Sequence, residues 1–144
     1  METKKAGCVV INTETKKTAI IFRDYLEDYS FPKGHLEEGE TLEECAIRET
    51  AEEIKRDCKI LTDIPVYIDR YITPKGEKCA CYMYLAVDTG ASDNDSTDTH
   101  EVIWLDENEV EDKLSYESLK KNWRAFLPHI KKLFNEKEIE KHLE

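Results

Sequence analysis

The spacing of charged residues between positions 34 and 53 constrains this chain more than any other feature. The segment has the form Gly-x5-Glu-x7-Arg-Glu-x2-Glu-Glu, and its members are Gly34, Glu40, Arg48, Glu49, Glu52 and Glu53. Carboxylates at this density repel one another unless a hard divalent cation lies among them. The alternative is a solvated helix face, on which Arg48 and Glu52 form a surface pair worth about 0.2–0.5 kcal/mol.

Residues 41–55 are expected to form an amphipathic helix. Thr41 is a good N-cap, and Glu44, three residues later, completes a capping box. At about 100° per residue, an apolar face and a carboxylate face lie on opposite sides of this helix. The apolar face comprises Ile47, Thr50, Ala51 and Ile54, and the carboxylate face comprises Glu49, Glu52 and Glu53 with Arg48 beside them. The helix is therefore predicted to pack on a sheet with one side and to present three carboxylates on the other.

This segment and its flank resemble a known family. Positions 34–56 resemble the Nudix box, the signature of MutT-like Nudix hydrolases, which act on nucleoside diphosphates linked to another moiety. The run Phe31-Pro32-Lys33-Gly34-His35 resembles the loop before the box in hydrolases of diadenosine tetraphosphate and related dinucleoside polyphosphates. The resemblance implies a single Nudix domain over residues 1–144, an α/β fold with an α/β/α sandwich around a mixed β-sheet, and a pyrophosphohydrolase activity.

Three positions near the end of the box depart from its usual pattern. Lys55 stands where a glycine is usual, Arg56 stands where an aliphatic residue is usual, and Thr50 replaces a larger apolar residue. A glycine would normally end the helix in the left-handed conformation. The departures therefore concern the helix C-cap and the start of the next strand, and none of them carries the chemistry.

The box resemblance and the carboxylate chemistry together predict a site for Mg²⁺, with Mn²⁺ as an alternative. Glu52 and Glu53 are the expected ligand pair, and Glu49, one helical turn before Glu53, either shares the site or acts as the general base. Arg48 is expected to fix Glu49 through a charge-assisted hydrogen bond. Glu40 is expected to accept backbone N–H groups at the loop–helix junction rather than to bind metal.

Two further metal ligands are expected outside the helix. The backbone carbonyl of Lys33 is one, because Gly34 lets the loop approach closely. Glu101 is the other, because it begins a strand after a polar loop and the run from His100 to Trp104 resembles the same region of dinucleoside polyphosphate hydrolases. The alternative for Glu101 is a surface carboxylate at a strand edge.

Lys33, His35 and Arg23 are the expected phosphate contacts. Lys33 and His35 lie at the expected mouth of the site, and Arg23 ends a strand that should run beside it. A solvated arginine at a strand end is the alternative for Arg23. An adenine base needs a flat apolar partner, for which Tyr82 is the candidate. Tyr82 and Tyr84 point the same way from one strand, and core packing is expected for at least one of them.

The rest of the chain is expected to supply the sheet and the second helical layer. Strands are predicted at residues 6–12, 18–23, 60–73, 78–87 and 101–105, and helices at residues 106–114 and 119–142. Residues 88–99 are polar and should form a mobile loop, and Pro128 should strain or kink the last helix. Strands with one helix between them and helices at the end favour an α/β/α sandwich.

Composition limits the partners of this chain. The net charge of −11 argues against a nucleic-acid surface, which needs a basic patch, but a metal can supply the positive charge that a small nucleotide substrate needs. No apolar run is long enough for a membrane span, and the first residues lack a signal-peptide core, so a cytoplasmic location is expected.

The five cysteines have no zinc spacing and are expected to be reduced and mostly buried. The chain is expected to act as a monomer or a homodimer.

Three functions are compatible with these residues. The first is hydrolysis of a dinucleoside polyphosphate, such as diadenosine tetraphosphate, with a nucleoside monophosphate among the products. The second is removal of a modified nucleoside triphosphate, or hydrolysis of ADP-ribose or a nucleotide sugar. The third is a Nudix-like binding domain without turnover, which would be expected to have lost one of the box carboxylates, whereas all four are present here.

Overall fold

The computed structural model describes the backbone of residues 2–143 and the side chains of residues 2–136. Its centre is a mixed β-sheet of eight strands, in which β1 (Thr3–Asn12) and β7 (Lys78–Ala91) lie side by side and parallel. The other strands pair antiparallel and are β2 (Lys17–Arg23), β3 (Asp28–Ser30), β4 (Lys33–His35), β5 (Arg56–Ile60), β6 (Tyr67–Ile72) and β8 (Glu101–Leu105). The helices are α1 (Leu42–Ile54), α2 (Glu107–Lys113) and α3 (Glu117–Leu143).

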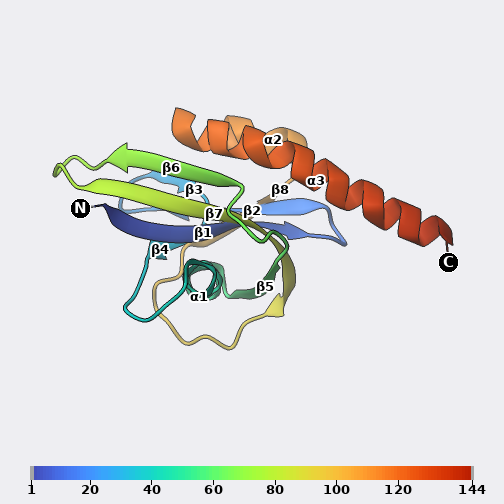
Figure 1. Cartoon of the computed structure of the whole chain (residues 1–144), viewed down its shortest axis with the longest axis horizontal. Helices are drawn as coiled ribbons and strands as arrows, with labels where there is room; N and C mark the ends of the chain where they lie inside the picture. Colours follow the sequence, from blue (N-terminus) through green and yellow to red (C-terminus); the bar gives the residue numbers. More distant parts are fainter. Residues whose placement is uncertain (1, 144) are drawn as a thin grey trace.

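Helices cover both faces of this sheet. Figure 1 shows α1 on one face and α2 with α3 on the other. Strand β1 contributes to two cores, because successive residues of a strand face opposite sides. Val9 and Ile11 pack in the core beneath α3, whereas Cys8 and Val10 pack in the core beneath α1. The predicted α/β/α sandwich around a mixed sheet is therefore confirmed.

The predicted start of α1 is confirmed in detail. The Glu44 backbone N–H donates to Thr41 Oγ1 at 3.1 Å, and the Thr41 N–H donates to Glu44 Oε1 at 3.0 Å. This reciprocal pair satisfies two N–H groups that the first helical turn leaves without a helical partner. The helix ends at Lys55, whose backbone is left-handed with φ 56° and ψ 38°.

The predicted apolar face of α1 is wrong at one position. Ile47 is 36% exposed. The buried residues of the helix are Cys45, Ala46, Thr50, Ala51, Glu53 and Ile54. Small side chains allow the helix backbone to lie close to β1, so the buried stripe passes through Cys45 and Ala46 and leaves Ile47 at the solvent side.

Several predicted boundaries change once the strands are paired. The single run predicted at 60–73 is two strands, β5 and β6, which pair with different stretches of β7. Strands β3 and β4 were not predicted, because three residues are too few for a period to be recognised. Strand β7 continues to Ala91, into the segment predicted to be a loop, and α3 continues through Pro128. One face of α3 is apolar, and its residues Trp123, Phe126 and Ile130 are buried in the core.

All five cysteines are buried and free, as predicted. Among the residues that the structure describes, no helix is both long enough and apolar enough to cross a membrane.

Candidate functional site

Arg48 is the centre of the charged cluster on α1. Its guanidinium donates to both oxygens of Glu40, from Nε at 2.6 Å and from Nη2 at 3.0 Å. Nη1 donates to Glu49 Oε1 at 2.9 Å and lies 3.2 Å from Glu52 Oε2, and Nη2 donates to the His35 carbonyl at 2.9 Å. The structure thus contains the expected Arg48–Glu49 contact. Glu40 also accepts the Glu37 backbone N–H at 3.0 Å, so it ties the loop before the helix to Arg48.

Gly34 makes room for the Glu49 carboxyl group. A Cβ atom added to Gly34 would lie 2.1 Å from Glu49 Cδ and 2.3 Å from each of its oxygens. Any larger residue would therefore displace this carboxyl. The glycine that opens the box pattern is thus explained by the position of Glu49.

Glu49, which is partly buried, and Glu53, which is buried, form a pair of carboxyl groups. Glu53 is 7% exposed in the last turn of α1. Burial first, and then the neighbouring Glu49 carboxyl, raise the pKa of Glu53 to about 9. Burial also raises the pKa of Glu49, against the opposing effect of Arg48. Two such groups cannot both ionise at low cost without a nearby cation, so the metal-free pair retains a proton near neutral pH.

The donors of this pair suit Mg²⁺, which prefers carboxylate oxygens. Within residues 2–136, however, no three His, Cys, Asp or Glu side chains are arranged as a preformed metal site. Glu52, the third expected ligand, is paired with Arg48 instead. A site with three carboxylates therefore requires Glu52 to turn away from Arg48, whereas Glu49 and Glu53 already lie together.

A cleft of about 560 Å³ lies over this pair and is called the carboxylate cleft below. It is lined by residues 24–25, 34–35, 37, 49, 53 and 97–100. His100 approaches the pair from outside the box, with Nε2 3.9 Å from Glu53 Oε2. Its backbone N–H also donates to the Glu53 carbonyl at 3.1 Å. The segment before β8 therefore forms one wall of the cleft.

A second hollow, of about 430 Å³, is called the basic pocket. Its charged and aromatic walls include Lys5, Arg23, Lys33, Asp69, Tyr71 and Tyr116. Lys33 Nζ lies 5.0 Å from the centre of the Tyr71 ring. Arg23 and Lys33 line the pocket, while the next residues in the chain, Asp24 and Gly34, line the carboxylate cleft. The two hollows thus share the turn after β2 and strand β4.

The structure distributes the expected phosphate contacts between these two hollows. His35 lines the carboxylate cleft, whereas the Lys33 and Arg23 side chains line the basic pocket. Arg23 is engaged by Asp28 through two hydrogen bonds of 2.7 Å. The Lys33 backbone reaches Glu53, where its hydrogen bond opposes the rise in the pKa of that carboxyl.

Four expected site residues line neither hollow, namely Arg48, Glu52, Tyr82 and Glu101. Arg48 and Glu52 are paired with each other beside the carboxylate cleft. Tyr82 is partly buried against the core beneath α1, and Tyr84 in the same core donates its hydroxyl to Glu43 Oε1 at 3.0 Å. Glu101 is exposed at the start of β8, and its neighbour His100 takes the place at the cleft. The role of Glu101 as a ligand stays a prediction.

Sequence reasoning missed Tyr71, Asp69 and His100 as wall residues. Asp69 and Tyr71 are two positions apart on β6 and therefore share one face of the strand. The sequence pattern of the strand does not say which of its faces lines a pocket. The run from His100 to Trp104 predicts a role for Glu101 only. A histidine directly before a strand that follows a polar segment was the available signal.

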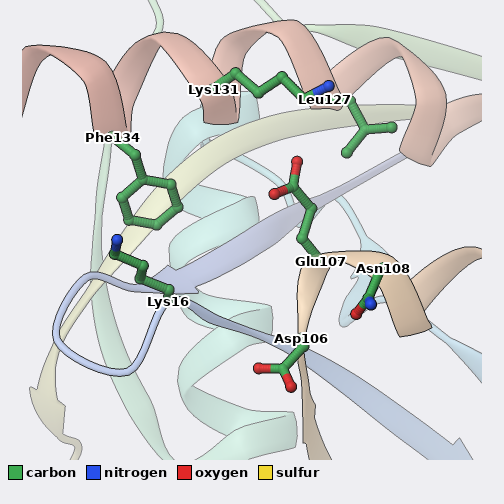
Figure 2. Close-up of a pocket in the computed structure, with 7 residues that line it drawn as sticks. All are labelled: Lys16, Asp106, Glu107, Asn108, Leu127, Lys131 and Phe134. Atoms are coloured by element: carbon green, nitrogen blue, oxygen red, sulfur yellow. The ribbon is translucent and has the colours of Figure 1, made fainter.

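A hollow of about 630 Å³ lies between the β1–β2 turn, α2 and α3 (Figure 2). Its walls are Lys16, Asp106, Glu107, Asn108, Leu127, Lys131 and Phe134. Lys16 Nζ lies 5.5 Å from the Phe134 ring centre, and Glu107 Oε1 is buried without a hydrogen-bond partner. It is larger than the carboxylate cleft, but no box residue lines it and its charges are of both signs. Size therefore does not locate the chemistry of this protein.

The Glu53 carboxyl should make stability depend on pH. Its pKa is raised from 4.5 to about 9, so the folded state holds a proton that the unfolded chain releases in this range. In chelator, the free energy of unfolding should therefore fall as pH rises from about 5 to 9, with a slope of at most about 1.4 kcal/mol per pH unit. Chemical denaturation at several pH values measures it. In Glu53→Gln the side chain stays neutral, and an equally steep fall in that variant would contradict the assignment.

Comparisons with known proteins identify the family of this chain. Residues 1–128 match the NUDIX domain family. An 8-oxo-(d)GTP phosphatase of Mycolicibacterium smegmatis is 30% identical over 113 residues, which cover 78% of this chain and 34% of the relative. The chain therefore spans about a third of the length of this curated relative.

Solved structures share the fold at low identity. A NUDIX hydrolase from Nitrosomonas europaea superimposes with a TM-score of 0.71 at 16% identity, covering 88% of each chain. The C. elegans Ap4A hydrolase in a binary complex gives a TM-score of 0.69 at 22% identity, covering 89% of this chain and 97% of the other. The E. coli dihydroneopterin triphosphate pyrophosphohydrolase gives 0.66 at 16% identity, with coverages of 90% and 99%. The family match over most of the sequence, together with this shared fold, shows that the chain belongs to the Nudix hydrolase family.

Proposed function

We propose that this Nudix domain is a metal-dependent pyrophosphohydrolase that cleaves a phosphoanhydride of a nucleotide in the carboxylate cleft. The observation that supports this most directly is the Glu49–Glu53 pair, held beside Arg48 and open to the cleft. Such a pair is costly without a cation, and proteins keep such arrangements at functional sites. When bound, a divalent metal, Mg²⁺ or Mn²⁺, supplies the positive charge that screens the phosphate oxygens and lowers the pKa of water.

The carboxylates of α1 are proposed to have two roles, metal binding and proton transfer. Glu53 and Glu52 are the proposed principal ligands, with Glu52 released from Arg48. Glu49, fixed by Arg48 and by the space at Gly34, is proposed to accept the proton of the attacking water as general base. The Lys33 carbonyl and Glu101 are proposed further ligands, because each is adjacent in the chain to a residue that lines the cleft.

The basic pocket is the proposed place for the nucleoside and the distal phosphates. Lys33 and Arg23 offer positive charge next to the cleft, and His35 offers a polar contact within it. Tyr71 is exposed to the pocket and is proposed as the stacking partner for the base, in place of Tyr82. A polyphosphate chain would thus run from the carboxylates across β4 into the basic pocket.

A dinucleoside polyphosphate, such as diadenosine tetraphosphate, is the proposed substrate class. The run from Phe31 to His35 supports it through its resemblance to that branch of the family, and the two hollows provide room for a long phosphate chain. Because the carboxylates address an anhydride near one end of the chain, diadenosine tetraphosphate should be cleaved asymmetrically into ATP and AMP.

A modified nucleoside triphosphate is the second candidate substrate. It is favoured by the identity of 30% with an 8-oxo-(d)GTP phosphatase. A panel of diadenosine tetraphosphate, 8-oxo-dGTP and ADP-ribose, each assayed with magnesium, separates the candidates by kcat/KM and by the phosphate products released. A wide preference for 8-oxo-dGTP or ADP-ribose would contradict the dinucleoside assignment and leave the family unchanged.

Lys33→Ala should lower kcat/KM for diadenosine tetraphosphate at least tenfold, because a charged hydrogen bond contributes roughly 1.5–3 kcal/mol. The loss should be smaller for ADP-ribose, whose shorter phosphate chain offers fewer distal oxygens. His35→Ala should show the same order of effects. Lys4→Ala is the matched control, since Lys4 is exposed on the same sheet and lines neither hollow. Equal losses for long and short substrates would contradict the assignment of distal phosphate contacts.

A further inference from the structure

Lys55 occupies a backbone conformation that would suit glycine better. It is the C-cap of α1, with φ 56° and ψ 38°, and its backbone N–H donates to the Ala51 carbonyl at 3.1 Å. Glycine adopts this left-handed conformation readily, whereas a side chain makes it less favourable. Helix capping alone therefore gives no reason for a lysine at this position.

The Lys55 side chain binds the backbone of the segment that leads to the cleft. Its ammonium group donates to the Asn94 carbonyl at 2.9 Å and also to the Ser96 carbonyl. The Lys55 carbonyl accepts the Ser92 backbone N–H at 3.0 Å. One residue thus binds residues 92–96 through both its main chain and its side chain.

Residues 92–100, called the cleft segment, have no strand or helix to hold them in place. Their internal hydrogen bonds are local, with the Asn94 N–H donating to Ser92 Oγ and the Ser96 N–H donating to Asn94 Oδ1. At the far end, the His100 N–H donates to the Glu53 carbonyl. Lys55 and Glu53, two residues apart at the end of α1, are therefore the two attachments of the segment to the helix that carries the carboxylates.

The cleft segment forms a wall of the site. Its residues 97–100 line the carboxylate cleft, including His100 beside Glu53. It also carries Asp93, Asp95 and Asp98, whose charges repel the phosphates of a substrate and one another. The Lys55 ammonium group, bound to two carbonyls of this segment, offsets part of this negative charge. It also restricts the conformations that the segment can adopt.

We propose that Lys55 is a positioning residue, whose ammonium group fixes the cleft segment as a preformed wall of the carboxylate cleft for the nucleotide phosphates. This inference rests on the proposed function for its effect on substrate, although the fixation itself does not. A wall that is already ordered spares the substrate the entropic cost of ordering it. Loss of the anchor should therefore act on substrate binding more than on the chemical step.

Lys55→Gly is the decisive variant, because it removes the ammonium group and relieves the backbone conformation at the same time. KM for the preferred nucleotide of the substrate panel should rise about tenfold, the lower limit for a lost charged hydrogen bond, with kcat changed less than about threefold. Lys55→Arg keeps donors that reach the two carbonyls and should restore KM. Lys59→Gly, at an exposed position of β5 four residues further along the chain, is the control for replacement of a lysine by glycine.

Hydrogen–deuterium exchange of the metal-free protein tests the anchor without any substrate. Peptides covering residues 93–99 should exchange faster in Lys55→Gly than in wild type or Lys55→Arg, while β7 peptides before this segment stay unchanged. Unchanged exchange overturns the anchor, and an unchanged KM in Lys55→Gly overturns the role in substrate binding. If no nucleotide of the panel is hydrolysed, the proposed function fails, and the exchange result still decides whether Lys55 fixes the segment.

Discussion

Glu53→Gln is expected to lower kcat by about 100-fold or more, the scale seen when a principal electrostatic contact of a transition state is removed. Glu53 is the most buried of the box carboxylates, and burial together with Glu49 raises its pKa to about 9. The metal-free protein therefore holds it largely neutral at pH 7, and glutamine has nearly the same shape as the protonated acid. The fold should be retained while the anionic oxygen needed for metal binding is lost. Steady-state kinetics, with circular dichroism to check the fold, provides the measurement.

Glu43→Gln is the matched control for this experiment. Glu43 lies on the same helix, is exposed, and accepts the Tyr84 hydroxyl at 3.0 Å, a bond that a glutamine carbonyl can also accept. Its kcat should stay close to that of wild type. Similar losses in the two variants would mean that loss of any carboxylate on α1 is sufficient, and the assignment of the active face would then be wrong.

Removal of divalent metal is expected to abolish hydrolysis altogether. Excess chelator should leave the Glu49–Glu53 pair protonated and the substrate phosphates unscreened, so that neither attack by water nor proton transfer to Glu49 is favoured. Added magnesium or manganese should restore turnover, and release of nucleoside monophosphate is the measurement. The protein should remain folded in chelator near pH 7, because a shared proton takes the place of the missing positive charge.

Turnover that persists in excess chelator would contradict the proposed mechanism. Loss of the fold in chelator would instead contradict the protonated state assigned to the Glu49–Glu53 pair. The two results are separated by recording circular dichroism on the assayed samples.

Local sequence was sufficient to predict α1 and the long strands. Thr41 and Glu44 form a capping box, and the helix residues after them include no glycine or proline. These two features predicted both ends of the helix to within one residue. The apolar runs that became β1 and β2 are buried as expected for a sandwich, whereas β8 is only partly buried. Burial of Glu53 was not predictable from the helical wheel, because it depends on how closely α1 and the Lys33 backbone approach each other.

The substrate side of the site required the tertiary structure. Lys33 and Tyr71 are 38 positions apart in the chain and meet only because β4 and β6 pair with the neighbouring strands β1 and β7. Tyr82 lies on β7, the strand that pairs with β6, but its side chain packs against the core beneath α1. Which aromatic residue lines a pocket depends on the order of the strands in the sheet and on the face that α3 covers. The alternation of residues along a single strand predicts neither of these.

The sequence by itself determined which carboxylates come together, because Glu49, Glu52 and Glu53 are placed by helix geometry within five residues of α1. Only the tertiary structure decided their state, through burial that leaves Glu49 and Glu53 sharing a proton and a pairing with Arg48 that keeps Glu52 apart. It also decided what surrounds them, since the cleft segment reaches Glu53 from 47 positions further along the chain and is held there by Lys55. Local patterns fix contacts between near neighbours in sequence, whereas burial and long-range hydrogen bonds exist only once the helix and the sheet have packed together.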